Sequence, residues 1–194
     1  MSTTFVYLLT LTIGTIDGWM NAMDKELNFK CPAGTAVYEI NSKHDNYFED
    51  RVFEILCRPT GKSSSGCQWT GYVNSFEQMF EFQCPNQSVL SGMESIHDNT
   101  AEDRRWKFYC CSFHGTLSEC QKLPKTHLDY AWSLYAPDNF VFRGVASSHD
   151  DNYHSIQHLQ LHDNAYEDRQ FEIGCRTTDK TTTSYQWTGE LKET

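Results

Sequence analysis

The sequence is short of basic residues, and this shortage restricts the partners that the chain is expected to bind. It has 16 Lys and Arg residues against 26 Asp and Glu residues, which gives a formal net charge of −10. Proteins bind nucleic acid through Lys and Arg surfaces that displace counterions from phosphates. We therefore expect no nucleic-acid partner, and the same charge disfavours simple polyanion binding.

Motifs of the common enzyme classes are also missing. The sequence has neither a nucleophile elbow nor the His-Glu-x-x-His pattern of zinc proteases. Its cysteines, if they form disulfides, are not available as thiolate nucleophiles. We therefore expect a binding protein rather than an enzyme.

One apolar run stands near the start of the chain and is too short to cross a bilayer. It covers residues 5–16, whereas a membrane-spanning helix needs about 20 apolar residues. Its length fits the hydrophobic region of a secretory signal. We predict a signal peptide over residues 1–18, no transmembrane segment, and secretion to the extracellular space or matrix. Cleavage after Gly14 or after Gly18 remains open, and a buried N-terminal strand is the alternative.

The eight cysteines form an even set, which in an exported chain favours four disulfides. No pair of cysteines or histidines stands beside another pair at the spacing of a zinc finger. We therefore predict a disulfide-stapled protein without a structural metal.

The main pattern in the sequence is a motif that occurs three times without a mismatch, His-Asp-Asn-x-x-Glu-Asp-Arg. Its copies cover residues 44–51, 97–104 and 162–169, and each is followed by a cysteine: Cys57, Cys110 and Cys175. Such self-similarity indicates tandem copies of one structural unit. The predicted units are residues 17–70, 71–123 and 124–194. The third carries an insertion of about 13 residues, 150–162, just after His149, where a further copy of the motif begins.

The segment after each motif alternates between apolar and polar residues, which is the period of a β-strand with one face toward a core. About four strands per unit give about twelve strands. We predict an all-β, single compact domain over residues 19–194 with pseudo-threefold symmetry, and both a trefoil-like and a prism-like closure remain open. The inward-facing residues are Phe53, Ile55, Cys57, Trp106, Phe108, Cys110, Phe171, Ile173 and Cys175.

The repeat also predicts the disulfide pairing. In the proposed rule, the cysteine before Pro pairs with the cysteine after the motif in its own unit, and the late cysteine pairs with the next unit. The middle unit must then serve two partners, and adjacent strand residues point to opposite faces. The predicted bridges are Cys31–Cys57, Cys67–Cys110, Cys84–Cys111 and Cys120–Cys175, and exchange of the two middle bridges is the alternative.

The chain resembles the dermatopontin family, which includes the hemagglutinin/amebocyte aggregation factors. The residues that carry the resemblance are Asp103-Arg104-Arg105-Trp106-Lys107-Phe108-Tyr109-Cys110-Cys111, the repeated Glu-Asp-Arg, and the Gly18-Trp19-x-Asn21 start. It implies a secreted, disulfide-linked protein with cell-adhesive, matrix-binding or carbohydrate-binding activity. The chain departs from the family pattern at Phe53 and Phe171, which stand where the family has Trp, and it lacks a Tyr-rich stretch near the start.

One interpretation of the motif is a glycan-binding site. Its polar side chains offer donors and acceptors to sugar hydroxyls, and a neighbouring Trp offers an apolar face to a pyranose ring. Three like sites would bind a cell multivalently. The predicted ligand-binding residues are His44, Asp45, Asn46, Glu49, His97, Asp98, Asn99, Glu102, His162, Asp163, Asn164, Glu167, Trp69 and Trp187.

The other interpretation makes the motif a device of the fold. The His-Asp-Asn half is typical of a turn, and the Asp-Arg half is suited to charge-assisted hydrogen bonds between units. The predicted structural ion-pair residues are Asp50, Arg51, Asp103, Arg104, Asp168 and Arg169. No cofactor is predicted, although Asn46, Glu49 and Asp50 offer oxygens of the kind that calcium binds.

Two further features complete the predictions from sequence. His154, His158 and His162 stand four residues apart, a spacing that suits either a metal site on a helix or, as we favour, a solvated loop. Asn86 begins the sequon Asn-Gln-Ser and is a predicted glycosylation site.

The predicted function is extracellular adhesion or agglutination through multivalent binding of cell-surface or matrix glycans. The alternatives are an organiser of the extracellular matrix that binds proteins or proteoglycans, and a secreted cytolytic or defence protein. A homo-oligomer is compatible with each of them.

Overall fold

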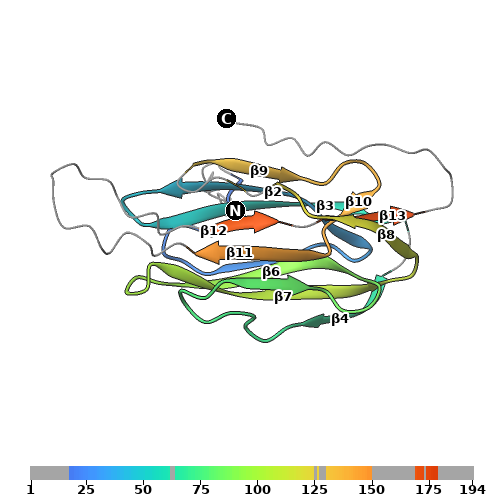
Figure 1. Cartoon of the computed structure of the whole chain (residues 1–194), viewed down its shortest axis with the longest axis horizontal. Coiled ribbons are helices and arrows are strands. Elements are labelled where there is room, and N and C mark those ends of the chain that lie inside the picture. Colours follow the sequence, from blue (N-terminus) through green and yellow to red (C-terminus); the bar gives the residue numbers. More distant parts are fainter. Residues whose placement is uncertain are drawn as a thin grey trace, which may run out of the picture.

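The computed structural model describes residues 18–61, 64–124, 126, 130–149, 169–172 and 174–178. These residues form thirteen strands and no helix, so the predicted all-β class is confirmed (Figure 1). In the described part of the chain, no helix is long and apolar enough to cross a membrane. The strands are β1 Leu27–Lys30, β2 Thr35–Asp45, β3 Asp50–Pro59, β4 Ser64–Trp69, β5 Phe80–Gln83, β6 Ser88–Asp98, β7 Asp103–Phe113, β8 Thr116–Gln121, β9 Trp132–Tyr135, β10 Phe140–Val141, β11 Gly144–His149, β12 Arg169–Glu172 and β13 Gly174–Thr178.

The first two units each build one long antiparallel hairpin around their copy of the motif. β2 pairs with β3 so that His44 lies opposite Arg51, and β6 pairs with β7 so that His97 lies opposite Arg104. The two hairpins have their register shift at the same place, between Val37 and Glu39 in one and at the matching residues in the other. The motif is therefore the connection between two strands, as the sequence predicted.

In the third unit, the corresponding pair is β11 and β12, and its register places His149 opposite Arg169. His149 thus takes the backbone position that His44 and His97 take in the other units. The predicted third-unit histidine, His162, lies outside the described residues, as do residues 150–168.

Short strands join each unit to the next one. β1 pairs with β6, β5 with β11, and β9 returns from the third unit to pair with β2 of the first. The register repeats, because each of these strands begins opposite a buried serine: Ser95, Ser147 and Ser42. Each short strand covers a hairpin edge that would otherwise expose unpaired backbone groups. Figure 1 shows β9 and β4 at opposite edges of the body. Pseudo-threefold symmetry of the whole chain stays a prediction.

Aromatic side chains from all three units meet in the core. Phe53, Trp106 and Trp132 are buried, and the rings of Phe53 and Trp106 meet edge to face with centroids 5.3 Å apart. Phe108 lies beside Trp106 in a parallel arrangement. The predicted inward face is therefore correct for Phe53, Ile55, Trp106 and Phe108. The side chains at 171, 173 and 175 lie outside the described residues.

The disulfides form within units and between the first two units, as the repeat rule predicts. The two adjacent cysteines of the second unit, however, exchange the partners that were predicted for them. Cys31–Cys57 forms as predicted. The two middle bridges are Cys84–Cys110 and Cys67–Cys111, so the predicted pairs Cys67–Cys110 and Cys84–Cys111 are wrong and the exchanged pairing, kept open as the alternative, is the one that forms.

The physical reason for the correction is the direction of two neighbouring side chains on β7. Cys110 continues the inward series of Trp106 and Phe108, and it therefore meets the buried Cys84. β4 pairs along the edge of β7, which brings Cys67 beside Cys111, the residue after Cys110. The Cα atoms of Cys67 and Cys111 are 4.0 Å apart. Cys120 is also disulfide-bonded, and the side chain of its predicted partner, Cys175, lies outside the described residues.

A buried ion pair fixes the first unit to the second. Arg104 donates from Nε to Oδ1 of Asp50 at 2.7 Å and from Nη2 to Oδ2 at 2.6 Å, and the two side chains are 5% and 3% exposed. Its remaining donors bind Ser95 and the carbonyl of Lys25. Arg51 uses the same geometry toward the third unit, where it donates to the carbonyl of Tyr130. The Asp-Arg half of the motif therefore joins units.

We predict that Arg104→Ala destabilises the fold by about 3–5 kcal/mol, because it leaves the Asp50 carboxylate buried without its cation. Urea denaturation measures this change. The control is Lys122→Ala, which removes an exposed pair with Glu81 and should cost less than about 1 kcal/mol. Equal losses in the two variants would contradict a special role for the buried pair.

Candidate functional site

The acidic residues at the hairpin tips act as turn formers. Oδ1 of Asp45 accepts the N–H of Tyr47 at 2.9 Å, and Oδ1 of Asp98 accepts the N–H groups of Thr100 and Ala101 at 2.9 and 3.1 Å. The hydrogen bond from Thr100, followed by that from Ala101, lowers the pKa of Asp98. These carboxylates are therefore already engaged in shaping the loop.

The motif histidines are buried rather than presented to a ligand at the surface. The side chain of His97 is 0% exposed and that of His44 is 1% exposed. Each has the motif Glu near its Nε2: Glu49 at 3.9 Å from His44 and Glu102 at 3.7 Å from His97. Desolvation lowers the pKa of His97, against the opposing effect of Asp50.

Only part of the motif thus reaches solvent in the first two units. The exposed members are Asn46 and Asn99, and Glu49 and Glu102 are partly buried in left-handed backbone conformations, with φ of 45° and 44°. The structure brings His, Glu and Asp together inside the body and leaves Asn at the tip. It does not gather the four predicted ligand residues on one surface.

Two asparagines, Asn21 and Asn74, have a structural role that was not predicted from the sequence. Oδ1 of Asn74 accepts the N–H of Trp106 and its Nδ2 donates to the carbonyl of Arg104, both at 2.9 Å. Asn21 makes the same two bonds to Phe53 and Arg51. The signal in the sequence that marks them is the shared Gly-x-x-Asn start of the first two units, at residues 18–21 and 71–74.

A group of cations and aromatic rings lies on the side of β7 that faces away from the core, and we call it the cationic aromatic face. Lys30 Nζ lies 4.6 Å from the ring centroid of Tyr109, and the Tyr109 ring packs against Trp69. The guanidinium of Arg105 lies 4.1 Å from the ring centroid of Tyr72. The members of the face are Lys30, Trp69, Tyr72, Arg105, Lys107 and Tyr109.

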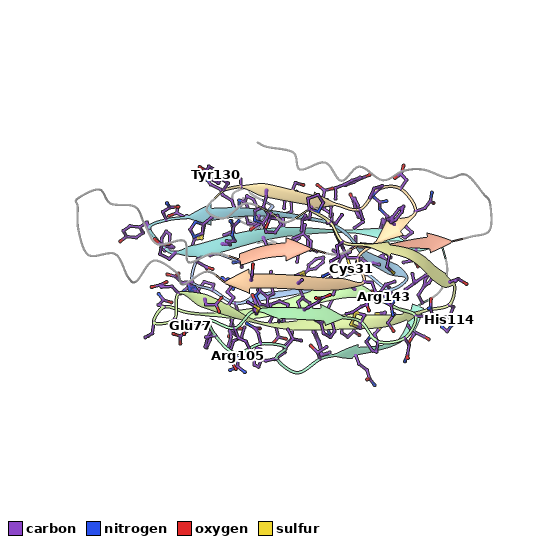
Figure 2. The ribbon with its side chains drawn as sticks, in the orientation of Figure 1. Cys31, Glu77, Arg105, His114, Tyr130 and Arg143 are labelled. Atoms are coloured by element: carbon purple, nitrogen blue, oxygen red, sulfur yellow. A yellow bond between two sulfur atoms is a disulfide. The ribbon has the colours of Figure 1, made fainter. Side chains whose placement is uncertain are left out.

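The cationic aromatic face is centred on β7 of the second unit, with Lys30 and Trp69 contributed by the first unit, and its β7 residues are not copied on β3. The hairpin register places Val52, Glu54 and Leu56 of β3 where β7 has Arg105, Lys107 and Tyr109. Figure 2 shows Arg105 at the edge of the body on the side of β7 and β4. A local positive surface therefore exists on a chain whose net charge is −10. The strand alternation of residues 103–111 was the signal that could have located it.

Trp69 belongs to this face and not to the hairpin tip with which the sequence grouped it. It pairs in register with Tyr109, six residues along β7 from the start of the strand at Asp103, or roughly 20 Å at the rise of an extended strand. The predicted ligand set is thus divided between two places.

Several predicted residues lie outside the described part of the chain or are described by backbone alone. Asn86 is exposed, and its glycosylation stays a prediction. Arg169 is described only as the first residue of β12. The residues outside the description are His154, His158, His162, Asp163, Asn164, Glu167, Asp168 and Trp187.

The family model for dermatopontin matches residues 21–158, which include both complete hairpins and their bridges. The chain belongs to the dermatopontin family. The resemblance inferred from the sequence is thereby confirmed, and with it the expectation of a disulfide-linked family member.

Three relatives show the range of names within the dermatopontin family. Millepora cytotoxin-1 of Millepora dichotoma is 33% identical over 79% of this chain and 64% of its own length. The hemagglutinin/amebocyte aggregation factor of Limulus polyphemus is 44% identical over 48% of this chain and 56% of its own. Dermatopontin of Biomphalaria glabrata is 39% identical over 48% of this chain and 62% of its own. The chain therefore spans less than two thirds of each of these relatives. No solved structure gives a significant match.

We predict that Asp98→Ala lowers the melting temperature, because the N–H groups of Thr100 and Ala101 lose their acceptor, whereas Asp98→Asn keeps an Oδ1 acceptor and loses less. Thermal denaturation followed by circular dichroism measures the difference. Asn99→Ala, at the exposed neighbouring position, is the control and should leave the melting temperature unchanged. If Asn99→Ala lost glycan binding without a change in stability, the hairpin tip would be part of the glycan-binding site.

Proposed function

We propose that this protein is a secreted adhesion or agglutination protein that binds anionic glycans of cell surfaces or matrix through the cationic aromatic face. The family membership and the names of the relatives support adhesion, agglutination or defence as the general activity. The observation that carries the glycan proposal is the alternation of three cations with three aromatic rings on one side of β7 and its neighbours.

The chemistry of this face suits a sugar that carries sulfate or carboxylate groups. Aromatic rings present flat apolar surfaces to pyranose rings, and Lys and Arg donate charge-assisted hydrogen bonds to anionic substituents. Rings and cations already contact each other, so binding orders few additional side chains. Lys107 donates a hydrogen bond to Glu94, which raises the pKa of Lys107, whereas Lys30 and Arg105 have no carboxylate partner within the part of the chain that the structure describes.

The acidic net charge of the chain is compatible with this proposal. Exposed charges more than about 8 Å apart are largely screened at physiological ionic strength. A bound anion therefore experiences the three nearby cations more strongly than distant carboxylates. The net charge of −10 is an average over the whole chain, so it disfavours polyanion binding in general but does not exclude a local basic cluster of this kind.

Agglutination requires more than one contact per particle. The first two units differ on their outer faces, so three equal sites are not part of this proposal. We propose that cross-linking arises from a homo-oligomer, or from two different sites on one chain, the cationic aromatic face and the exposed hairpin tips. In either case, binding at one site raises the effective concentration of ligand at the other.

We predict that the double variant Lys30→Gln/Arg105→Gln binds sulfated or sialylated glycans about tenfold more weakly than the wild type, from the loss of two charged contacts. A glycan array followed by titration of the best ligand at two salt concentrations measures this change. The double variant should also depend less on salt. The control variant, Lys43→Gln/Lys122→Gln, changes the net charge equally at exposed positions outside the face and should bind as the wild type.

The alternatives give different results in the same experiments. An organiser of the matrix would bind purified matrix proteins without inhibition by free glycans. A cytolytic protein would release dye from lipid vesicles that carry no glycan, a result that the name of the Millepora relative makes worth testing. Equal glycan binding by both double variants would contradict a role for the cationic aromatic face.

A further inference from the structure

We propose that a divalent transition-metal ion of the zinc class binds between the first and second units, held by Asp24, Asp50 and His97. Asp24 and Asp50 come from the first unit and His97 from the second. One ligand atom from each residue lies within 4.8 Å of the other two. This proposal departs from the sequence, which predicted no metal, and it is independent of the proposed glycan binding.

The distances among these atoms suit coordination better than hydrogen bonding. His97 Nδ1 lies 3.5 Å from Asp50 Oδ2 and 3.6 Å from Asp24 Oδ1. Hydrogen bonds between nitrogen and oxygen are usually 2.7–3.2 Å long. Ligands that surround zinc tetrahedrally at about 2.0–2.2 Å are separated from one another by roughly 3.3–3.6 Å.

Among the residues that the structure describes, the imidazole at the centre of the cluster has no hydrogen-bond partner. The His97 side chain is fully buried, and neither of its nitrogens makes a hydrogen bond, while Asp24 Oδ1 is also buried and unbonded. Burying polar atoms without partners is costly. A cation in contact with Nδ1 and Oδ1 would satisfy both atoms at once.

The surroundings have the features of an outer coordination shell. Glu102 Oε2 lies 3.7 Å from His97 Nε2, beyond hydrogen-bond distance but on the opposite side of the ring from the cluster, which is the side from which a carboxylate orients a ligating histidine. Asp50 is held in place by Arg104 and by the N–H of Asp24 at 2.8 Å. Ligating carboxylates are commonly fixed by such hydrogen bonds.

The charge balance also favours a divalent cation. The carboxylates of Asp24, Asp50 and Glu102 lie around His97 together with one guanidinium, that of Arg104, so that negative charge is in excess at the junction. A divalent ion offsets this excess. Zinc and similar ions accept imidazole with carboxylates, whereas calcium requires six to eight oxygen ligands. The three protein ligands leave one tetrahedral position for water.

The frame of the site recurs at the next junction. The N–H of Glu77 donates to Asp103 Oδ2 at 2.7 Å, as Asp24 does to Asp50, and the β11–β12 register gives His149 the position of His97. A second ion at this junction would have Glu77 as a ligand in the position that Asp24 has in the first site. The test therefore measures whether a variant loses one equivalent of bound zinc, and not whether it loses all zinc binding.

The experiment uses the full chain with its disulfides intact, stripped with EDTA and desalted. Isothermal titration with zinc chloride should show saturable binding, and zinc should raise the melting temperature by about 5 °C at saturating concentration. Calcium chloride should produce no such shift. Cobalt(II) should give the visible absorption of a tetrahedral site with nitrogen and oxygen ligands.

Asp24→Asn should remove one equivalent of zinc while leaving the Asp50–Arg104 pair in place. His97→Gln should remove the same equivalent, and Asp24→Asn decides the question if His97→Gln does not fold. His114→Gln, an exposed histidine that bonds to Ser65, is the control and should retain full stoichiometry. The absence of saturable zinc binding in the stripped wild type, or full stoichiometry in Asp24→Asn, would overturn the proposal.

Discussion

A polar contact buried between the first and second units fixes how the two hairpins pack against each other. Arg104 of the second hairpin binds Asp50 of the first with two short hydrogen bonds, in a place where water does not screen them. Removing either partner would leave a buried charge alone, which is a far larger penalty than the loss of a surface pair. The Asp-Arg part of the motif therefore joins the first two units, and Arg51 reaches the third unit through the carbonyl of Tyr130.

The sequence predicted the fold class and much of the core because strand alternation is a local signal. Phe53, Trp106 and Phe108 point inward as their spacing indicates. It could not distinguish Cys110 from Cys111 as the partner of Cys84, since that choice depends on how β4 pairs with the edge of β7. The same limitation applies to the motif histidines. Their composition suggested a surface loop, whereas both side chains are buried and His97 faces Asp24 and Asp50 of the first unit.

The units share a scaffold and differ where they meet solvent. Asn21 and Asn74 make the same bonds, and the two hairpins have the same register and the same bulge. The outward positions of β3 and β7 nevertheless carry unlike residues, acidic or aliphatic in one and cationic or aromatic in the other. Repetition therefore preserves what lies between units, while the outer faces are free to acquire separate ligands.

The return of β9 to the first hairpin has a consequence for biosynthesis. β2, at residues 35–45, lacks its neighbour until Trp132–Tyr135 has left the ribosome. Until then the nascent chain carries an open sheet edge, which is the kind of surface that attracts wrong partners and chaperones. Pairings across such long stretches of sequence also fold slowly. Truncation before β9 would thus affect the beginning of the protein as much as its end.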